Sequence, residues 1–271
     1  MVKINKSAVI LVGTSPECLF SLKQVLNSEC NVMGVVFCEH TSLIHRIKSE
    51  YKRIIKYGFI RRLSQITLAI IYKIIFGRSD KSYIKNCFNN ITLNDIYDEL
   101  AKNKITHIST EKYDSQKGID FIKNKNPDFL VCHTPYWIDK KVRILPNDGL
   151  VIGGHPGIVP AYRGSHSAFW SIFDECPRKN GYSIFCIDHG VDSGSIIHQK
   201  HIEYDYNISY RSNDYLLMKL ISFALAEVAE EYSRGIQILS KPQTNLLKSQ
   251  IRTAPGILDF LKFQLKLRNK N

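Results

Sequence analysis

Residues 7–16 read SAVILVGTSP, an unbroken apolar run followed by glycine, serine and proline. A short apolar run bounded by turn residues predicts a buried strand. Ser15 and Pro16 are residue types that favour the N-cap and the first turn of a helix. Apolar residues then recur at helical spacing to about residue 27, and residues 31–37 predict a second strand. Strand, helix and strand joined by short links predict the opening of a parallel α/β sheet.

The alternation of strands and helices continues along the chain. It predicts a Rossmann-like α/β fold, with a mostly parallel sheet and helices on both faces. Gly13 has no GxGxxG partners, so NAD binding is not expected even though Glu39 follows the second strand. Further strands are expected at 105–108, 128–132, 150–152, 182–187 and 195–202, and further helices at 92–102, 115–124, 167–173, 213–232 and 257–261.

Residues 41–82 interrupt this alternation. Apolar residues recur there at helical spacing on both sides of Gly58, which predicts a helical hairpin inserted after the second strand. The segment holds ten Lys or Arg residues and two acidic ones, and so carries +8 of the chain's net charge of +12. A phosphate-bearing substrate, an anionic membrane surface or nucleic acid could use this charge. A solvated helix face is the alternative.

Composition favours a soluble, cytoplasmic protein. The 271 residues can bury the core of one large α/β domain, and no secretory signal precedes the first strand. Seven cysteines form no CxxC or CxxH pair, which favours buried, reduced thiols. The longest apolar stretch, 66–76, contains Lys73 and is too short to span a bilayer. No metal site is expected, because no metal-ligand spacing relates His133, His155, His166, His189 and His198.

Two loops carry the residues best suited to chemistry. Residues 153–164 read GGHPGIVPAYRG, and residues 188–194 read DHGVDSG. His155 follows a strand, and its ring is not expected to be buried in regular packing because glycine and proline flank it. Ligands of open α/β sheets bind beyond the carboxyl ends of the strands, where this loop should lie. A carboxylate beside an imidazole makes it a usable proton donor, so His155 and Asp192 are predicted to be a catalytic pair.

These two motifs, in this order, resemble the signature of formyltransferases that use 10-formyltetrahydrofolate. The resemblance extends over residues 1 to about 235 and includes the run PYWI at 135–138. It implies a catalytic domain at 1–235 that contains the helical insertion, followed by a C-terminal extension at 236–271. The insertion, GSHSAFW at 164–170 and RTAP at 252–255 are similar to a less characterised branch often labelled methionyl-tRNA-formyltransferase-like.

The resemblance implies roles for the matching residues. The histidine that matches His155 stabilises and protonates the tetrahedral intermediate, and the aspartate that matches Asp192 tunes it and relays protons through water. Arg163 and His166 follow the catalytic loop and are candidate contacts for the acceptor, with structural roles as the alternative. The pterin of 10-formyltetrahydrofolate would be held, largely through backbone groups, by Pro135, Tyr136, Trp137, Ile138, Asp188, Gly190 and Val191.

One position departs from the family pattern. Gly153 stands where the family has an asparagine that donates a hydrogen bond to the developing oxyanion, and losing one such donor typically costs about 10²–10³ in rate. Three explanations remain open. A backbone N–H or a water could approach the oxyanion at Gly153, another side chain could supply the donor, or the chain has lost formyl transfer and kept the fold. The candidate side chains are Asn147, Thr134 and His133.

The expected function is formyl transfer to the amine of a nucleotide-linked amino sugar for surface polysaccharide, a small and phosphate-bearing substrate. No tRNA substrate is expected, because only a short tail follows Gly235. The alternatives are an enzyme that formylates another amine or hydrolyses 10-formyltetrahydrofolate, and an impaired relative that binds an anionic ligand or membrane. A homodimer and a peripheral contact with anionic membranes are also left open, the latter through a basic insertion in which Arg61 and Arg62 are expected to contribute.

Overall fold

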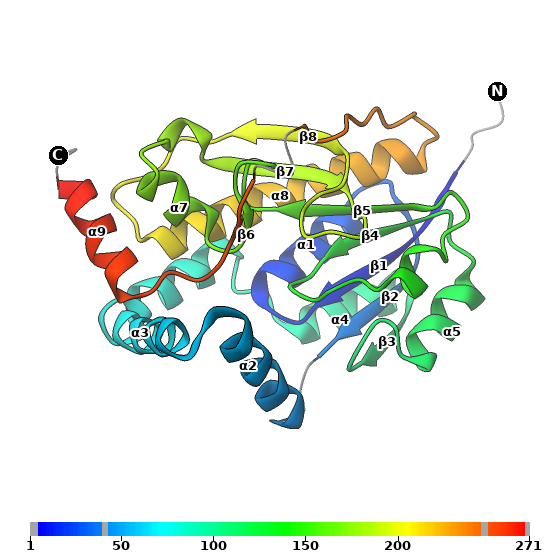
Figure 1. Ribbon diagram of the computed structural model, residues 1–271. Coiled ribbons are helices and arrows are strands. Elements are labelled where there is room, and N and C mark those ends of the chain that lie inside the picture. The colour runs from blue at the N-terminus through cyan, green and yellow to red at the C-terminus, as the bar shows by residue number, and fades with distance from the viewer. Residues whose placement is uncertain (1–4, 40–42, 245–248, 269–271) are drawn as a thin grey trace.

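A computed structural model describes residues 5–39, 43–244 and 249–268. At its centre is a seven-stranded sheet in the order β3-β2-β1-β4-β5-β7-β8 (Figure 1). Neighbouring strands from β3 to β5 are parallel, whereas β7 is antiparallel to both β5 and β8. The strands are β1 Ser7–Gly13, β2 Asn31–Cys38, β3 Thr106–Thr110, β4 Phe129–His133, β5 Leu150–His155, β7 Gly181–Cys186 and β8 Ile196–His201. The predicted Rossmann-like sheet is confirmed.

The helices alternate with the strands, and a small two-stranded sheet lies apart from the main one. This second sheet pairs β6 Arg163–Gly164 with β9 Ile251–Arg252. The helices are α1 Pro16–Asn27, α2 Leu43–Tyr57, α3 Phe59–Cys87, α4 Leu93–Lys102, α5 Gln116–Lys125, α6 Lys140–Arg143, α7 Ser167–Phe173, α8 Tyr210–Ser233 and α9 Ile257–Arg268, with a short 3₁₀ turn at Pro177–Lys179.

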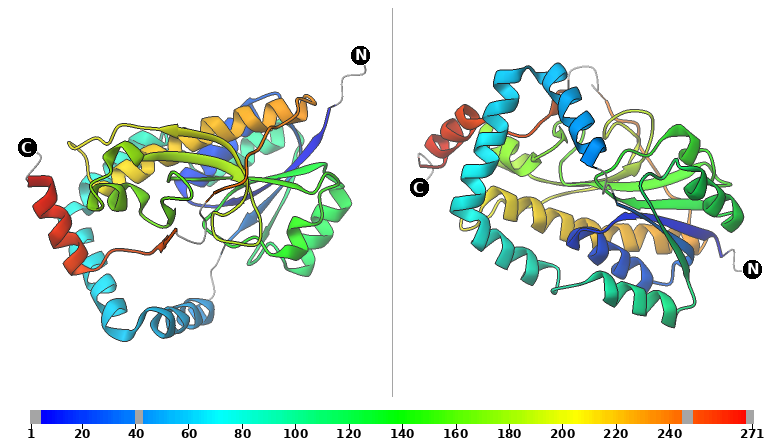
Figure 2. Two further views of the ribbon diagram at one scale, coloured as in Figure 1. Left: turned by 45° about the horizontal axis from the view of Figure 1, so that its top comes forward. Right: turned by 90° about the horizontal axis from the view of Figure 1, so that it is seen from below.

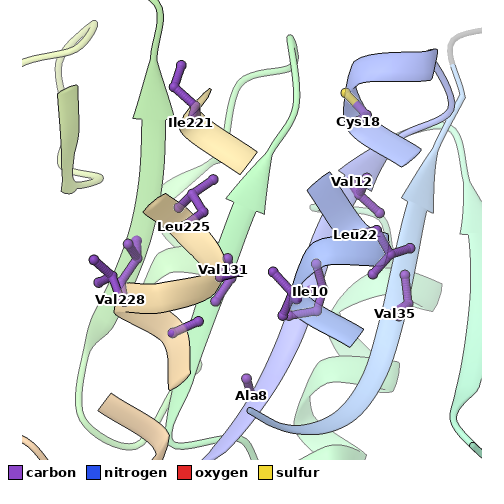
Figure 3. Packing of buried hydrophobic residues seen from close by; sticks show 14 of the residues in the cluster. Ala8, Ile10, Val12, Cys18, Leu22, Val35, Val131, Ile221, Leu225 and Val228 are labelled. Carbon is purple, nitrogen blue, oxygen red and sulfur yellow. The ribbon is translucent and has the colours of Figure 1, made fainter. Parts of the chain in front are cut away.

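Helices cover both faces of the sheet. On one face, Ile10 of β1 packs with Leu22 of α1 and Leu225 of α8 (Figure 3). On the other face, Leu11 of β1 belongs to a cluster that includes Ile122 of α5. Successive residues of a strand point to opposite faces, so the continuous apolar run of β1 supplies both layers. The carboxyl ends of β1, β2, β4 and β5 therefore meet at one edge of a rigid, doubly covered sheet.

The predicted insertion forms two helices, α2 and α3, which run outside the sheet (Figure 2). It ends at Cys87, later than the expected boundary at 82. One side of α3 is buried through Leu68, Tyr72 and Asp80. The Asp80 carboxylate accepts a hydrogen bond of 2.7 Å from the hydroxyl of Ser209, the N-cap residue of α8. The insertion is therefore fixed to the domain along α3.

The expected C-terminal extension packs against the rest of the chain. Phe263 of α9 is 2% exposed and stacks on Phe169 of α7 at a centroid distance of 4.5 Å. Phe260 of α9 meets Tyr72 of α3 edge to face. The helix α9 continues well beyond the expected 257–261, because aromatic residues on one side of it pack against the rest of the chain. This cluster joins α3, α7 and α9.

Candidate active site

His155 ends β5 and is surrounded by hydrogen-bonding groups. Its Nε2 lies 2.7 Å from the carbonyl oxygen of Tyr162 and 3.2 Å from the hydroxyl of Ser167. Its Nδ1 lies 3.5 Å from Oδ2 of Asp192. The residue is only 5% exposed, so the expectation of an unburied ring was wrong. The loop folds back over the ring, and its own Tyr162 carbonyl covers Nε2.

Asp192 lies in the loop between β7 and β8. Its φ of 48° is in the left-handed region, which aspartate tolerates better than most residues. Its Oδ2 accepts a hydrogen bond of 2.8 Å from the backbone N–H of Gly164, in addition to facing His155. The carboxylate therefore joins the histidine loop to the aspartate loop. The predicted pairing of His155 with Asp192 is present in the geometry.

Gly157 allows the histidine loop to close tightly. A Cβ at this position would stand 2.4 Å from the Tyr162 carbonyl oxygen, 2.5 Å from the Ser167 hydroxyl and 2.6 Å from Nε2 of His155. Real side chains do not approach this closely, so any residue larger than glycine would push the imidazole or the backbone aside. The glycine is required by the packing around the ring.

Side chains of the antiparallel strands hold the same loop from beneath. The Ser183 hydroxyl of β7 donates to the Gly157 carbonyl at 2.7 Å and accepts from the Val159 N–H at 3.2 Å. Gln199 of β8 donates to the Val159 carbonyl at 2.7 Å. These bonds satisfy backbone groups that a buried loop would otherwise leave unpaired. The sequence analysis did not single out either side chain.

The aspartate loop is held from inside and from the C-terminal segment. Oδ1 of Asp188 accepts from the Gly190 N–H at 2.9 Å and from the Ser193 hydroxyl at 2.6 Å. Nε2 of Gln243 donates to the carbonyls of Asp192 and Gly194 at 2.9 and 2.8 Å. Asp188 thus shapes the turn by using its own carboxylate. Gln243, about fifty residues later, carried no signal in the sequence that could have linked it to this loop.

Arg163 and His166 make contacts within the protein. Nε of Arg163 donates to the Val191 carbonyl at 2.8 Å, and Nη1 donates to the Ser249 hydroxyl at 3.0 Å. Nδ1 of His166 lies 3.4 Å from Oδ2 of Asp214. The Arg163 side chain is buried, and its contacts favour the structural alternative, in which it supports the aspartate loop. His166 precedes α7 in a left-handed conformation and is partly exposed.

The segment expected to hold a pterin follows β4. Ile138 is buried in the same cluster that the side chains of Tyr136 and Ile187 pack against. Trp137 is 56% exposed, and Pro135 is exposed as well. Because Ile187 begins the aspartate loop, this shared cluster anchors the segments around 135–138 and 188–191 to one region of the sheet edge. An exposed indole beside backbone groups suits a flat aromatic ring.

Residues 86–212 match the family described as Formyl transferase. This part of the chain is therefore similar to a formyl transferase domain. Among curated relatives, the methionyl-tRNA formyltransferase of Finegoldia magna is 24% identical over 60% of this chain and 51% of its own length. The GDP-perosamine N-formyltransferase of Brucella melitensis is 30% identical over 35% of this chain and 36% of its own. The chain spans about half the length of the first curated relatives it matches.

Solved structures show that the fold extends through the insertion and the C-terminal segment. A 4-N formyltransferase from Francisella tularensis has a TM-score of 0.53 at 17% identity, and covers 95% of this chain and 78% of its own. A sugar N-formyltransferase from Shewanella sp. has a TM-score of 0.54 at 14% identity, covering 96% and 86%. The match to the formyl transferase family contains both His155 and Asp192.

Gly153 lies within β5 and within the match to the formyl transferase family, and it pairs with Cys132 on one side and Phe185 on the other. A Cβ at this position would stand 2.7 Å from Cδ1 of Ile187. The space next to the glycine on this face is therefore filled by the Ile187 side chain. This leaves little room for a water or a reacting group to reach the backbone there.

Two of the three candidate donors are badly placed. The backbone N–H of Asn147 bonds to the Pro127 carbonyl, ahead of β4 and β5, at the edge of the sheet opposite His155. His133 pairs in register with Val12, whose side chain faces α1 and α8, so its ring points away from the face of Gly153. Thr134 is the remaining candidate donor.

Two other kinds of chemistry, metal binding and attack by a cysteine thiol, find little support among the described residues. Within 5–39, 43–244 and 249–268, no group of three or more His, Cys, Asp or Glu side chains could hold a metal. Burial raises the pKa of the thiols of Cys18, Cys30 and Cys38 to about 12. These thiols stay protonated at neutral pH, which makes them poor nucleophiles. Paired acid–base chemistry at His155 and Asp192 is what the arrangement can perform.

Proposed function

We propose that this protein transfers a formyl group from 10-formyltetrahydrofolate to the amine of a nucleotide-linked amino sugar. The observation that carries the proposal is the pairing of His155 with Asp192 at the carboxyl edge of the sheet, inside the match to the formyl transferase family. Bound 10-formyltetrahydrofolate would supply an activated formyl carbon. Pro135 and Trp137, with the backbone of the aspartate loop, offer the apolar and polar contacts that a pterin ring needs.

The hydrogen-bonding partners of His155 indicate what it does. The Tyr162 carbonyl can only accept a hydrogen, so Nε2 carries one. An ionised Asp192 also only accepts, so a hydrogen on Nδ1 would point toward its Oδ2. Because the Tyr162 carbonyl covers Nε2, a hydrogen on Nδ1 is the one that His155 would give to the oxygen of the formyl group or to the leaving nitrogen. The 3.5 Å separation of Nδ1 from Oδ2 exceeds an ordinary hydrogen bond, and we expect it to shorten when substrates bind.

The proposed role of Asp192 is to accept a proton from the attacking amine. The attacking amine forms the new C–N bond as the bond from the formyl carbon to the folate nitrogen breaks, and the amine must lose a proton. The Asp192 carboxylate is partly exposed and fixed by the Gly164 N–H, so it can accept that proton directly or through water. Arg163 and Gln243 keep the loop in place by bonding to Val191 and Gly194.

The amino-sugar acceptor is supported by relatives and by a hollow that is lined in part by a lysine. The GDP-perosamine N-formyltransferase is among the curated relatives, and two solved sugar or 4-N formyltransferases share the fold over nearly the whole chain. A hollow of about 480 Å³ lies against residues 158–161 of the histidine loop and is lined in part by Lys179 and by Arg252, whose guanidinium is paired with Asp174. The ammonium group of Lys179 suits a phosphate of a nucleotide.

Formyl transfer by the purified chain tests the proposal. With 10-formyltetrahydrofolate, we expect an N-formyl product from a nucleotide-linked amino sugar and none from methionyl-tRNA. His155→Ala and Asp192→Asn should each lower kcat by about 10²–10⁴. The exposed His198 provides the matched control, and His198→Ala should leave the rate unchanged.

Three outcomes would contradict the proposal. Transfer at the normal rate by His155→Ala would remove the assigned role of the histidine. Release of formate without transfer to any amine would instead identify a 10-formyltetrahydrofolate hydrolase. Binding of folate with no turnover at all would identify an impaired relative.

A further inference from the structure

The outer side of α3 is apolar and open to solvent. Side chains on this side recur every three or four residues, so they lie in one row along the helix. Leu68 and Tyr72 mark the opposite, buried side. Exposure in the row ranges from 39% for Ile66 to 78% for Ile74. The members of the row are Phe59, Leu63, Ile66, Ile70 and Ile74.

Rows on α2 and α9 enlarge this surface. Ile47, Tyr51 and Ile55 of α2 recur every fourth residue, and Leu258, Leu261 and Leu265 of α9 recur at three and four. Each of these side chains is more than half exposed. We call the three rows together the apolar face.

The α3 and α9 rows meet at the start of the two helices. Phe59 of the α3 row and Leu258 of the α9 row line one hollow of about 610 Å³, and Arg61 bridges to Asp259 at 3.0 Å. Both helices lie on the side of the molecule away from the N-terminus (Figure 1), and Figure 2 shows them at the periphery from two further directions. The apolar face is therefore an outer surface on which exposed apolar side chains recur in rows rather than singly.

Positive charge continues directly from the α3 row. Arg78 and Lys81 follow Ile74 at four and seven residues, which keeps them on the same side of the helix, and Lys73 flanks it. All three are exposed, and none forms an ion pair within the part of the chain that the structure describes.

Arg61 and Arg62 differ from these three cations because both form ion pairs. Arg61 bonds to Asp259, and Arg62 bonds to Glu50 at 2.6 Å and to Gln65. These ion pairs argue against the expected contribution of Arg61 and Arg62 to membrane binding. Their ion pairs hold α2, α3 and α9 together, and the available cations lie further along α3.

An occupant of this surface must match both an apolar row and unpaired cations. A second copy of this chain, with a net charge of +12, would bring like charges together. A bilayer containing anionic lipid offers an apolar interior and phosphates at the correct relative depth. Among the described residues, no helix has the length and apolar character needed to cross a membrane, which leaves binding along the surface.

We propose that α2, α3 and α9 bind the surface of an anionic membrane. The apolar face lies in the boundary between headgroups and acyl chains, and Lys73, Arg78 and Lys81 lie against lipid phosphates. This inference does not depend on the proposed enzymatic function, since it rests on the exposure and charge of the three helices.

Sedimentation of the full chain with vesicles tests the charge requirement. We expect binding to vesicles that contain phosphatidylglycerol, weak binding to phosphatidylcholine alone, and a steep fall with salt. The triple variant Lys73→Glu, Arg78→Glu and Lys81→Glu should weaken the partition coefficient by about 100-fold or more. The matched control, Lys102→Glu, Lys123→Glu and Lys140→Glu, changes net charge equally at exposed sites elsewhere and should keep most of the binding.

A second pair of variants tests the apolar rows. Replacing Ile66, Ile70 and Ile74 with serine should weaken binding while leaving its dependence on salt. Serine at the exposed Ile144, Ile236 and Leu239 should change little. Circular dichroism and urea unfolding verify that each variant folds.

The proposal is overturned if the unaltered chain fails to bind phosphatidylglycerol vesicles at low salt. Equal losses in both glutamate triples would show attraction by net charge without a defined surface. Light scattering that reports a dimer, abolished by the serine triple on α3, together with no vesicle binding, would assign the apolar face to a second copy.

Discussion

Thr134 is the candidate donor that lies on the side of Gly153 and still has a hydrogen to donate. Its Oγ1 accepts from the Tyr113 hydroxyl at 2.9 Å and from the Tyr136 N–H at 3.2 Å, which leaves its own O–H free to donate. Cys132 pairs in register with Gly153, and Thr134 lies two residues further along the same strand direction. Period-two alternation puts Thr134 on the face that holds Tyr113 and Gly153. It is thus the candidate for the role that asparagine has in the family.

Removing this hydroxyl should reduce the rate of formyl transfer. Thr134→Val is expected to lower kcat by about 10²-fold, the usual effect of deleting one oxyanion donor. Thr134→Ser keeps the hydroxyl and should retain most of the activity. Steady-state kinetics measure kcat of both variants. Urea unfolding measures how much stability is lost when the buried Tyr113 hydroxyl has no acceptor, so that a folding defect is not mistaken for a loss of rate.

The double variant with Gly153→Asn provides a further check. An asparagine side chain requires Ile187 to move, because its Cβ would stand 2.7 Å from Cδ1 of that residue. If the movement occurs, Gly153→Asn should restore at least about tenfold in the Thr134→Val background. Unchanged kcat in Thr134→Val would show that the oxyanion is stabilised by another group.

His133 makes stability depend on pH. Burial lowers the pKa of His133 to about 4 from 6.5, and its Nδ1 finds no partner among the described residues. The folded state thus favours the neutral ring. Its contribution is fully present above the unfolded pKa near 6.5 and is lost as pH falls toward 4. Between pH 7 and 5, we expect His133 to remove roughly 2 kcal/mol of unfolding free energy.

Urea unfolding at the two pH values measures this loss. His133→Leu should show a smaller decrease than the unaltered chain, because leucine has no proton to gain. Comparing the two chains removes the contribution of the other histidines. Equal decreases in both chains would show that His133 does not titrate differently in the folded state.

At the scale of elements, the sequence predicted regular structure better than it predicted contacts between distant segments. The spacing of apolar residues predicted the ends of β1, α1 and β2 to within a residue or two, because local packing determines those elements. It also predicted the α2–α3 hairpin. The end of α3 was placed too early, since Tyr83 and Cys87 are held by packing against α8, which local pattern does not reveal.

In the candidate site too, local features could be predicted from the sequence and contacts between distant segments could not. Glycine and proline around His155 and Asp192 marked the two loops, so their pairing could be predicted. The clamps by Ser183, Gln199 and Gln243 could not, because each joins residues that are 16 to 51 positions apart in sequence. The burial of His155 was missed for a related reason, since the loop's own Tyr162 returns to cover the ring.

At the scale of the whole molecule, α9 connects the C-terminal segment to the insertion. Phe263 is 2% exposed among Phe169, Tyr210 and Phe260. Phe263→Ala should lower the free energy of unfolding by about 3–5 kcal/mol, because a buried aromatic side chain leaves a cavity. Urea unfolding measures the change.

Leu261→Ala is the matched control on the same helix. Leu261 is 54% exposed, so its truncation should change stability by less than about 0.5 kcal/mol. A similarly small effect of Phe263→Ala would mean that α9 detaches without disturbing the domain.

The point at which the insertion leaves the sheet has a geometric consequence. β2 ends at Cys38 and α2 begins at Leu43, so the hairpin departs from the same rim on which β5 delivers His155. A chain resting on a bilayer by this hairpin would keep its reaction centre on the rim nearest the lipid.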